Sequence, residues 1–198
     1  YGGCRLQHQC RRRSRGYPLS GAGMSMRFGA RTIRDASLGS STLVPPGVSR
    51  ILGQDRSCRV FNSAVQSISN ATETAVTFDS ERWDTDNMHS TTANTSRLTA
   101  VTAGKYFILA NVGFAQNGTG IRFLRLRLNG NEALPIAGVY VPASADINSD
   151  HRMFVATYYN MALNDFVEVI IYQDSGGALN TLQNAQESPE FMMIKFPF

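Results

Sequence analysis

The sequence is poor in charged residues and in cysteine, and it has no long apolar segment. Charged residues make up 17% of the 198 residues. This low share, with abundant Ser, Thr, Asn and Gly, is typical of all-β extracellular or virion proteins. No apolar run reaches the roughly 18 residues of a membrane-spanning helix, so we expect no membrane partner. The three cysteines, Cys4, Cys10 and Cys58, are odd in number and predict no disulfide framework.

The sequence also lacks the motifs that common catalytic sites require. It contains no Gly-x-Ser-x-Gly nucleophile turn, no phosphate-binding loop and no His-Glu-x-x-His zinc motif. Its three histidines, His8, His89 and His151, are far apart in regions of different character. We therefore expect that the protein is not an enzyme and that it needs no cofactor.

The net charge of +4 hides a division of the chain into a basic and an acidic part. Residues 1–59 contain eleven arginines and two aspartates, a net charge of +9. Residues 60–198 contain eight basic and thirteen acidic groups, a net charge of −5. Residues 1–23 have too few large apolar side chains to fold alone. The asymmetry predicts a basic, extended N-terminal arm over residues 1–59 and a separately folded domain over residues 60–198.

The arginines of the arm are its sharpest charged feature. Such a cluster can neutralise the phosphates of a nucleic acid without reading its sequence, dock on the carboxylates of an acidic protein surface, or remain solvated. We favour docking on a protein partner over binding of nucleic acid. The residues expected to dock are Arg11, Arg12, Arg13, Arg15, Arg27, Arg31 and Arg34.

From about Val60 onward, apolar and polar residues alternate with a period of two, which is the pattern of β-strands. Asn129-Gly130 follows one of these runs and is a strong hairpin signal. No stretch keeps the apolar spacing of a helix for three turns. The pattern predicts an all-β domain, either a two-sheet sandwich or a jelly roll. The expected strands lie at 74–78, 106–114, 123–128, 153–161, 166–172 and 191–196.

Several of these expected strands are apolar on both faces. A sandwich buries only one face of each sheet, so a second apolar face needs a cover from elsewhere. The cover we expect is another copy of the chain, which predicts an oligomer. The residues expected at the interface between copies are Tyr106, Ile108, Tyr158, Tyr172 and Phe191.

An ordered series of short segments resembles one known family, the C1q/TNF-like domain in the version found in bacteriophage head and tail proteins. The resemblance covers residues 60–196. Its segments are TFDSERWDTDNMH at 77–89, SRLT at 96–99, TAGKYFI at 102–108, LRLRLNG at 124–130, NDFVEV at 164–169 and SPEFM at 188–192.

This resemblance implies a ten-stranded jelly roll that assembles into a compact homotrimer. It implies a binding and assembly module that is not an enzyme. The family packs aromatic and aliphatic residues around a threefold axis, which agrees with the doubly apolar strands. The chain departs from the animal members because it has no collagen-like stem. The basic arm lies outside the resemblance.

Two clusters of oxygen ligands are candidates for a calcium site. One contains Asp84 and Asp86, and the other contains Asp146 and Asp150. Calcium takes six to eight oxygen ligands from such loops. The alternative is that these side chains cap turns through hydrogen bonds to the backbone, and no complete calcium-binding loop motif is present. We favour the capping role and expect no bound metal.

These observations together suggest a structural protein of a bacteriophage virion. The hypothesis is a trimeric capsid decoration or head-fibre protein that its basic arm anchors to the major capsid protein. One alternative is a tail-fibre tip that recognises a host surface receptor through loops such as 84–95 and 143–151. A second alternative is a jelly-roll coat subunit whose arm binds the genome.

Overall fold

A computed structural model describes residues 33–34, 41–42, 55–133, 135–143, 151–184 and 188–196. The chain divides into two units, residues 1–47 and 48–198. In the first unit, β1 (Ile33–Arg34) and β2 (Ser41–Thr42) form a two-stranded antiparallel ladder. Every other described strand belongs to the second unit, which we call the body.

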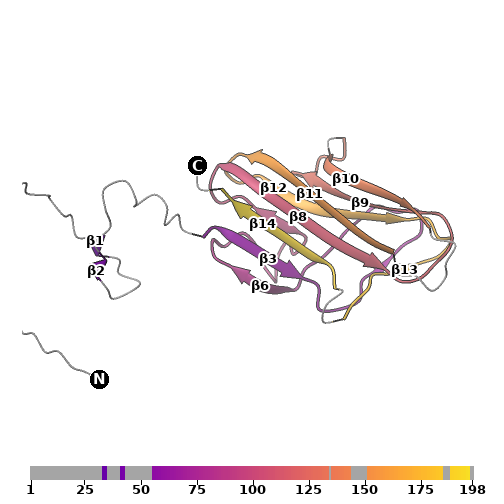
Figure 1. The fold of residues 1–198 in the computed structure, drawn as a ribbon. Coiled ribbons are helices and arrows are strands. Elements are labelled where there is room, and N and C mark those ends of the chain that lie inside the picture. The colour runs from indigo at the N-terminus through magenta and orange to yellow at the C-terminus, as the bar shows by residue number, and fades with distance from the viewer. Residues whose placement is uncertain are drawn as a thin grey trace, which may run out of the picture. The chain divides into compact units, whose positions relative to one another are not determined.

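The first sheet of the body has five antiparallel strands in the order β11-β8-β14-β3-β6 (Figure 1). β8 and β11 are its longest strands, with 11 residues each, and they pair along their whole lengths. The five strands are β3 (Ser57–Phe61), β6 (Ser80–Asp84), β8 (Gly104–Phe114), β11 (His151–Met161) and β14 (Glu190–Lys195).

The second sheet has the order β10-β9-β12-β5, and β7 also pairs with β12. A small ladder of β4 (Ser67–Ile68) and β13 (Leu179–Asn180) accompanies the two sheets. The strands of the second sheet are β5 (Thr74–Ala75), β7 (Arg97–Thr99), β9 (Ile121–Leu128), β10 (Pro135–Pro142) and β12 (Phe166–Gln173).

The chain reverses between β9 and β10 at the pair Asn129-Gly130, as the sequence predicts. Both residues have positive φ angles, 51° and 69°. The backbone N–H of Asn131 donates to the carbonyl of Leu128 at 2.9 Å and closes the turn. Left-handed backbone at both central positions is the geometry that asparagine followed by glycine favours.

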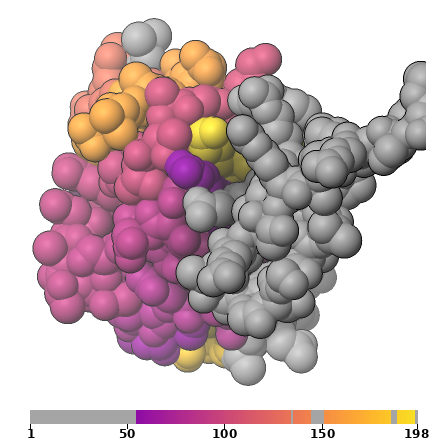
Figure 2. All heavy atoms as spheres, turned by 90° about the vertical axis from the view of Figure 1, so that its left-hand side faces the viewer, coloured from indigo at the N-terminus to yellow at the C-terminus, as the bar shows by residue number. Residues whose placement is uncertain are grey.

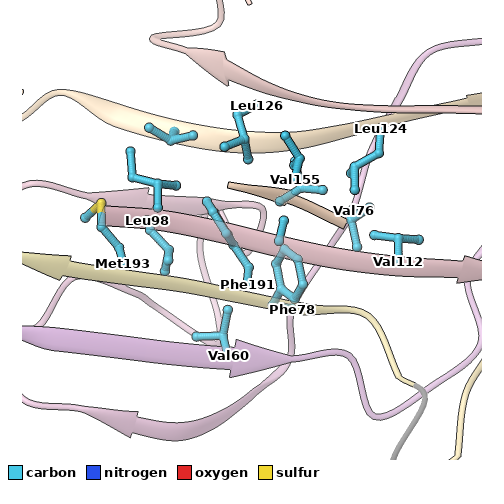
Figure 3. Close-up of a cluster of buried hydrophobic side chains, with 14 of the residues drawn as sticks. Val60, Val76, Phe78, Leu98, Val112, Leu124, Leu126, Val155, Phe191 and Met193 are labelled. Carbon is cyan, nitrogen blue, oxygen red and sulfur yellow. The ribbon is translucent and has the colours of Figure 1, made fainter. Parts of the chain in front are cut away.

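The hydrophobic core lies between the two sheets, which face each other with alternate side chains pointing inward (Figure 3). Phe78 and Phe191 occupy its centre, with their ring centroids 5.6 Å apart. Both rings are fully buried. Around them lie residues of both sheets, including Val60, Ile108, Val112, Leu124, Leu126, Val155 and Met193.

The prediction of an all-β domain is confirmed. The described part of the chain contains strands and no helix, so it has no helix that could cross a membrane. The runs of alternating residues that begin near residues 106, 123, 153, 166 and 191 form β8, β9, β11, β12 and β14. β3 begins at Ser57, three residues before the expected start of the domain. The role of residues 1–59 as a separate arm stays a prediction.

Phe191→Ala is expected to destabilise the body by about 3–5 kcal/mol, because the truncation leaves a cavity beside Phe78 at the centre of the sandwich. Urea denaturation measures the free energy of unfolding. Leu163→Ala is the control, since Leu163 is 59% exposed and its truncation should change that free energy by less than about 0.5 kcal/mol. Equal losses in the two variants would contradict this core.

Candidate interaction surfaces

Apolar side chains gather on the outer face of the first sheet, where Asn111 of β8 also points outward, opposite Phe154. The side chains of β8 that do not enter the core point outward, and the outward residues of β11 and β14 lie directly beside them in register. Phe154 and Tyr158 are exposed, at 58% and 67%. We call this set the aromatic face; it consists of Phe107, Leu109, Phe154, Ala156, Tyr158, Met192 and Ile194.

Ring contacts organise one end of the aromatic face. The ring of Tyr158 lies between Phe107 and Phe196, with centroid distances of 5.1 Å and 5.2 Å. Aromatic side chains contribute much of the energy of protein interfaces, because each removes a large apolar area from water. Exposed apolar patches of this kind are candidates for interaction sites.

A group of charged residues borders the aromatic face on β3, β6 and β14. Glu190 forms ion pairs with Arg59 and with Arg82. The guanidinium of Arg82 also lies 4.2 Å from the centre of the Phe61 ring. Both arginines are partly exposed, so these pairs contribute little to stability. They give the apolar area a polar border, as at many protein interfaces.

The structure corrects the expected interface for three of its five residues. Tyr106, Ile108 and Phe191 have no accessible surface within a single subunit, so they belong to its core and cannot face a partner. Burial raises the pKa of the Tyr106 hydroxyl, which donates to the carbonyl of Thr102 at 2.7 Å. The physical reason is that side chains alternate between the two faces of a strand, and in β8 the even-numbered residues are the ones that point into the core.

The other two expected interface residues lie on opposite sides of the sandwich. Tyr158 belongs to the aromatic face of the first sheet. Tyr172 lies on β12 in the second sheet, where its ring stacks on Phe123 at a centroid distance of 4.9 Å. The sequence pattern identifies a strand with two apolar faces, but it does not say which face is the inner one.

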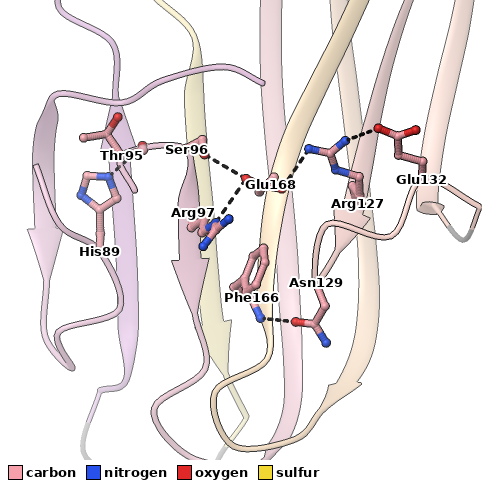
Figure 4. A network of polar contacts seen from close by, with 9 residues as sticks. All are labelled: His89, Thr95, Ser96, Arg97, Arg127, Asn129, Glu132, Phe166 and Glu168. Atoms are coloured by element: carbon pink, nitrogen blue, oxygen red, sulfur yellow. Dashed lines mark hydrogen bonds and ion pairs between the residues drawn. The ribbon is translucent and has the colours of Figure 1, made fainter. Parts of the chain in front are cut away.

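A buried carboxylate organises the outer face of the second sheet (Figure 4). Glu168 is only 5% exposed. It accepts hydrogen bonds from Arg97 Nε at 3.3 Å and Arg127 Nη2 at 3.0 Å, and from Ser96 Oγ at 3.0 Å. Glu168 is not among the site residues that the sequence predicts, and its only sequence signal is that it is the one acidic residue within the apolar run of β12.

The loop that follows β6 is held by its own polar groups. Asp84 accepts hydrogen bonds from the backbone N–H groups of Asp86 at 3.1 Å and His89 at 2.9 Å. The buried ring of His89 lies with Nδ1 2.9 Å from Glu81 Oε1 and Nε2 3.2 Å from the carbonyl of Thr95. These two contacts fix the orientation of the ring within the loop.

Asp84 thus has the turn-capping role that the sequence suggests as the alternative to calcium binding. Asp86 Oδ2 lies 3.7 Å from Arg56 Nη1, within an ion pair. Among the described residues, no group of three or more histidine, cysteine, aspartate or glutamate side chains could hold a metal ion. The second candidate cluster, Asp146 and Asp150, lies outside the described residues. A role of calcium stays untested.

The arginines expected to dock on a partner are not part of the described body. Arg34 is in β1, where only the backbone is described. The others lie outside the described residues: Arg11, Arg12, Arg13, Arg15, Arg27 and Arg31. Their role therefore stays a prediction.

Comparison with known proteins identifies the fold. No protein-family model matches the sequence, and no curated protein matches it in sequence. Among solved structures, murine APRIL at pH 5.0 matches with a TM-score of 0.56 and 12% identity, over 72% of this chain and 99% of that chain. APRIL at pH 8.0 gives 0.55 and 11% over the same shares. Eiger TNF from S. frugiperda gives 0.50 and 10%, over 72% and 93%. The body has the TNF-like jelly-roll fold.

Glu168→Ala is expected to lower the free energy of unfolding by about 3 kcal/mol, because it leaves Arg97 and Arg127 close together without their shared carboxylate. Thermal and urea denaturation measure this change. The control is Glu132→Ala, since Glu132 also contacts Arg127 but its side chain is 78% exposed, and its loss should cost less than about 1 kcal/mol. If both variants lose the same stability, Glu168 does not organise this surface.

Proposed function

We propose that the protein is a homotrimeric assembly and binding module without catalytic activity, in which the aromatic face forms the contact between subunits. The single observation that carries this proposal is the exposure of Phe154 and Tyr158 on β11, the edge strand of the first sheet, beside the other apolar side chains of the aromatic face. Leaving such a face in water is unfavourable, and burying it against another copy removes the cost.

The TNF-like fold supports the same assembly, since the family that the sequence resembles forms trimers. A ring of three copies is a closed arrangement, so every copy of the face is covered and none remains to recruit a further subunit. The partly exposed charges around Glu190 would then lie near the margin of the contact, where water still reaches them.

The finer proposal concerns where this module works. We infer a structural protein of a bacteriophage virion, a capsid decoration or head-fibre protein whose arm fastens the trimer to the major capsid protein. The net charge of +9 over residues 1–59 supports the anchoring role. Three arms on one trimer would bind together, so even weak single contacts would give a stable attachment.

Tyr158→Glu is expected to convert the trimer into folded monomers, because a carboxylate cannot be buried in an apolar contact without a partner. Analytical ultracentrifugation gives the mass, and circular dichroism checks the fold. Tyr140→Glu is a matched control, because Tyr140 lies in the second sheet, away from the aromatic face. Its side chain is 65% exposed and packs on Phe123 of the same sheet, with ring centroids 5.2 Å apart. A monomeric wild-type protein, or a trimeric Tyr158→Glu variant, would contradict the proposed interface.

Replacing Arg11, Arg12, Arg13 and Arg15 by alanine should leave the trimer folded but abolish its binding to purified empty capsids, because the arm loses its contacts to acidic groups. Co-sedimentation with capsids measures the binding. Wild-type protein that binds bacterial cells but not capsids would favour the tail-fibre alternative. Wild-type protein that binds nucleic acid but not capsids would favour the coat-subunit alternative.

A further inference from the structure

A pocket of about 370 Å³ opens on the outer side of the second sheet. The loop after β6 forms one wall with Asn87, Ser90 and Asn94, and the sheet forms the other with Arg97 and Phe166. The volume is within the range of small-molecule sites, about 300–1,000 Å³.

The loop that forms one wall of this pocket is held in place by hydrogen bonds within the protein, without a ligand. Asn87 and Asn94 have φ angles of 54° and 52°, a left-handed conformation that asparagine tolerates better than most residues. Between them, the ring of His89 is held by Glu81 and the carbonyl of Thr95. Figure 2 looks at the end of the body where β6 ends, and magenta atoms from this part of the chain lie on the surface there. A preformed wall reduces the entropy lost on binding.

Arg97 contributes a guanidinium group to the sheet wall of the pocket. It shares Glu168 with Arg127, and Arg127 has a second carboxylate at Glu132. Within the described part of the chain, the guanidinium of Arg97 donates only through Nε, to Glu168, while its backbone N–H donates to the carbonyl of Asn94. Its guanidinium lies over the Phe166 ring, 4.0 Å from the ring centre. The two terminal nitrogens of Arg97 can therefore donate hydrogen bonds to both oxygens of a carboxylate.

Neutral hydrogen-bonding groups surround this charge. The side-chain amides of Asn87 and Asn94 and the hydroxyl of Thr99 line the pocket. None of the three side chains has a hydrogen-bond partner among the residues that the structure describes. An amide offers a donor and an acceptor, and so does each hydroxyl group of a sugar ring.

We propose that this pocket binds an acidic sugar, a hexuronic acid whose carboxylate pairs with Arg97 and whose hydroxyl groups bind the amides of Asn87 and Asn94. The charge selects the acid, and the amides select a ring rich in hydroxyl groups over a simple anion. This binding activity goes beyond the proposed assembly role and depends neither on the trimer nor on the virion.

Isothermal titration calorimetry of the full chain with glucuronate, glucose and acetate tests the proposal. Glucuronate should bind about tenfold more tightly than either of the others, because each of those lacks one half of the recognised chemistry. Arg97→Gln should weaken glucuronate binding at least about tenfold. Arg125→Gln is the matched control and should change nothing, since Arg125 pairs with Glu73 and stacks on Phe123 away from the pocket.

Asn94→Gly provides a second test that leaves the charge network intact. Glycine accepts the left-handed backbone of Asn94, so the loop should keep its path while one amide is lost. Glucuronate binding should fall severalfold, while acetate binding should not change. Acetate that binds as tightly as glucuronate, or an Arg97→Gln variant that binds normally, would overturn the proposal. Sedimentation of the same samples separates this result from any failure of the trimer.

Discussion

The structure depends on one strand, β8, which is apolar on both of its faces. Its even-numbered residues enter the core between the sheets, and its odd-numbered residues Phe107 and Leu109 form the middle of the aromatic face. Period-two alternation makes these two sets inseparable, because a shift by one residue would exchange them. The hydrophobic core and the exposed aromatic face are therefore set by the same strand and the same register.

Much of this architecture could be predicted from the sequence. The alternating runs identified the long strands, and Asn129-Gly130 identified a reversal that the structure confirms with two positive φ angles. The inward and outward faces could not be predicted. Tyr106 and Tyr158 look alike as aromatic residues in apolar strands, yet one is fully buried and the other is 67% exposed. Which face is inner depends on the opposing sheet, and a single strand carries no information about that sheet.

The polar surface of the second sheet was the hardest part to predict, because its residues are distant in sequence. Glu168 is brought together with Ser96, Arg97 and Arg127 only through the pairing of β12 with β7 and β9. Each residue alone is an ordinary surface side chain. The loop after β6 was predicted as rich in turn-capping groups, and Asp84 fills that role. The hydrogen bonds of the His89 ring to Glu81 and to the carbonyl of Thr95 form only when the folded loop brings these residues together.

The two ends of the body meet at one place. The backbone N–H of Lys195, at the end of β14, donates to the carbonyl of Arg56 at 2.9 Å, just before β3 begins. A short linker could therefore join the two ends. New termini placed in an exposed loop such as 162–165 should then give a circularly permuted body that still folds. The same neighbourhood sets the response to force. Residues 56 and 195 lie at the same end of the antiparallel pair of β3 and β14. A force that separates them would therefore break the hydrogen bonds of this pair one after another rather than all at once.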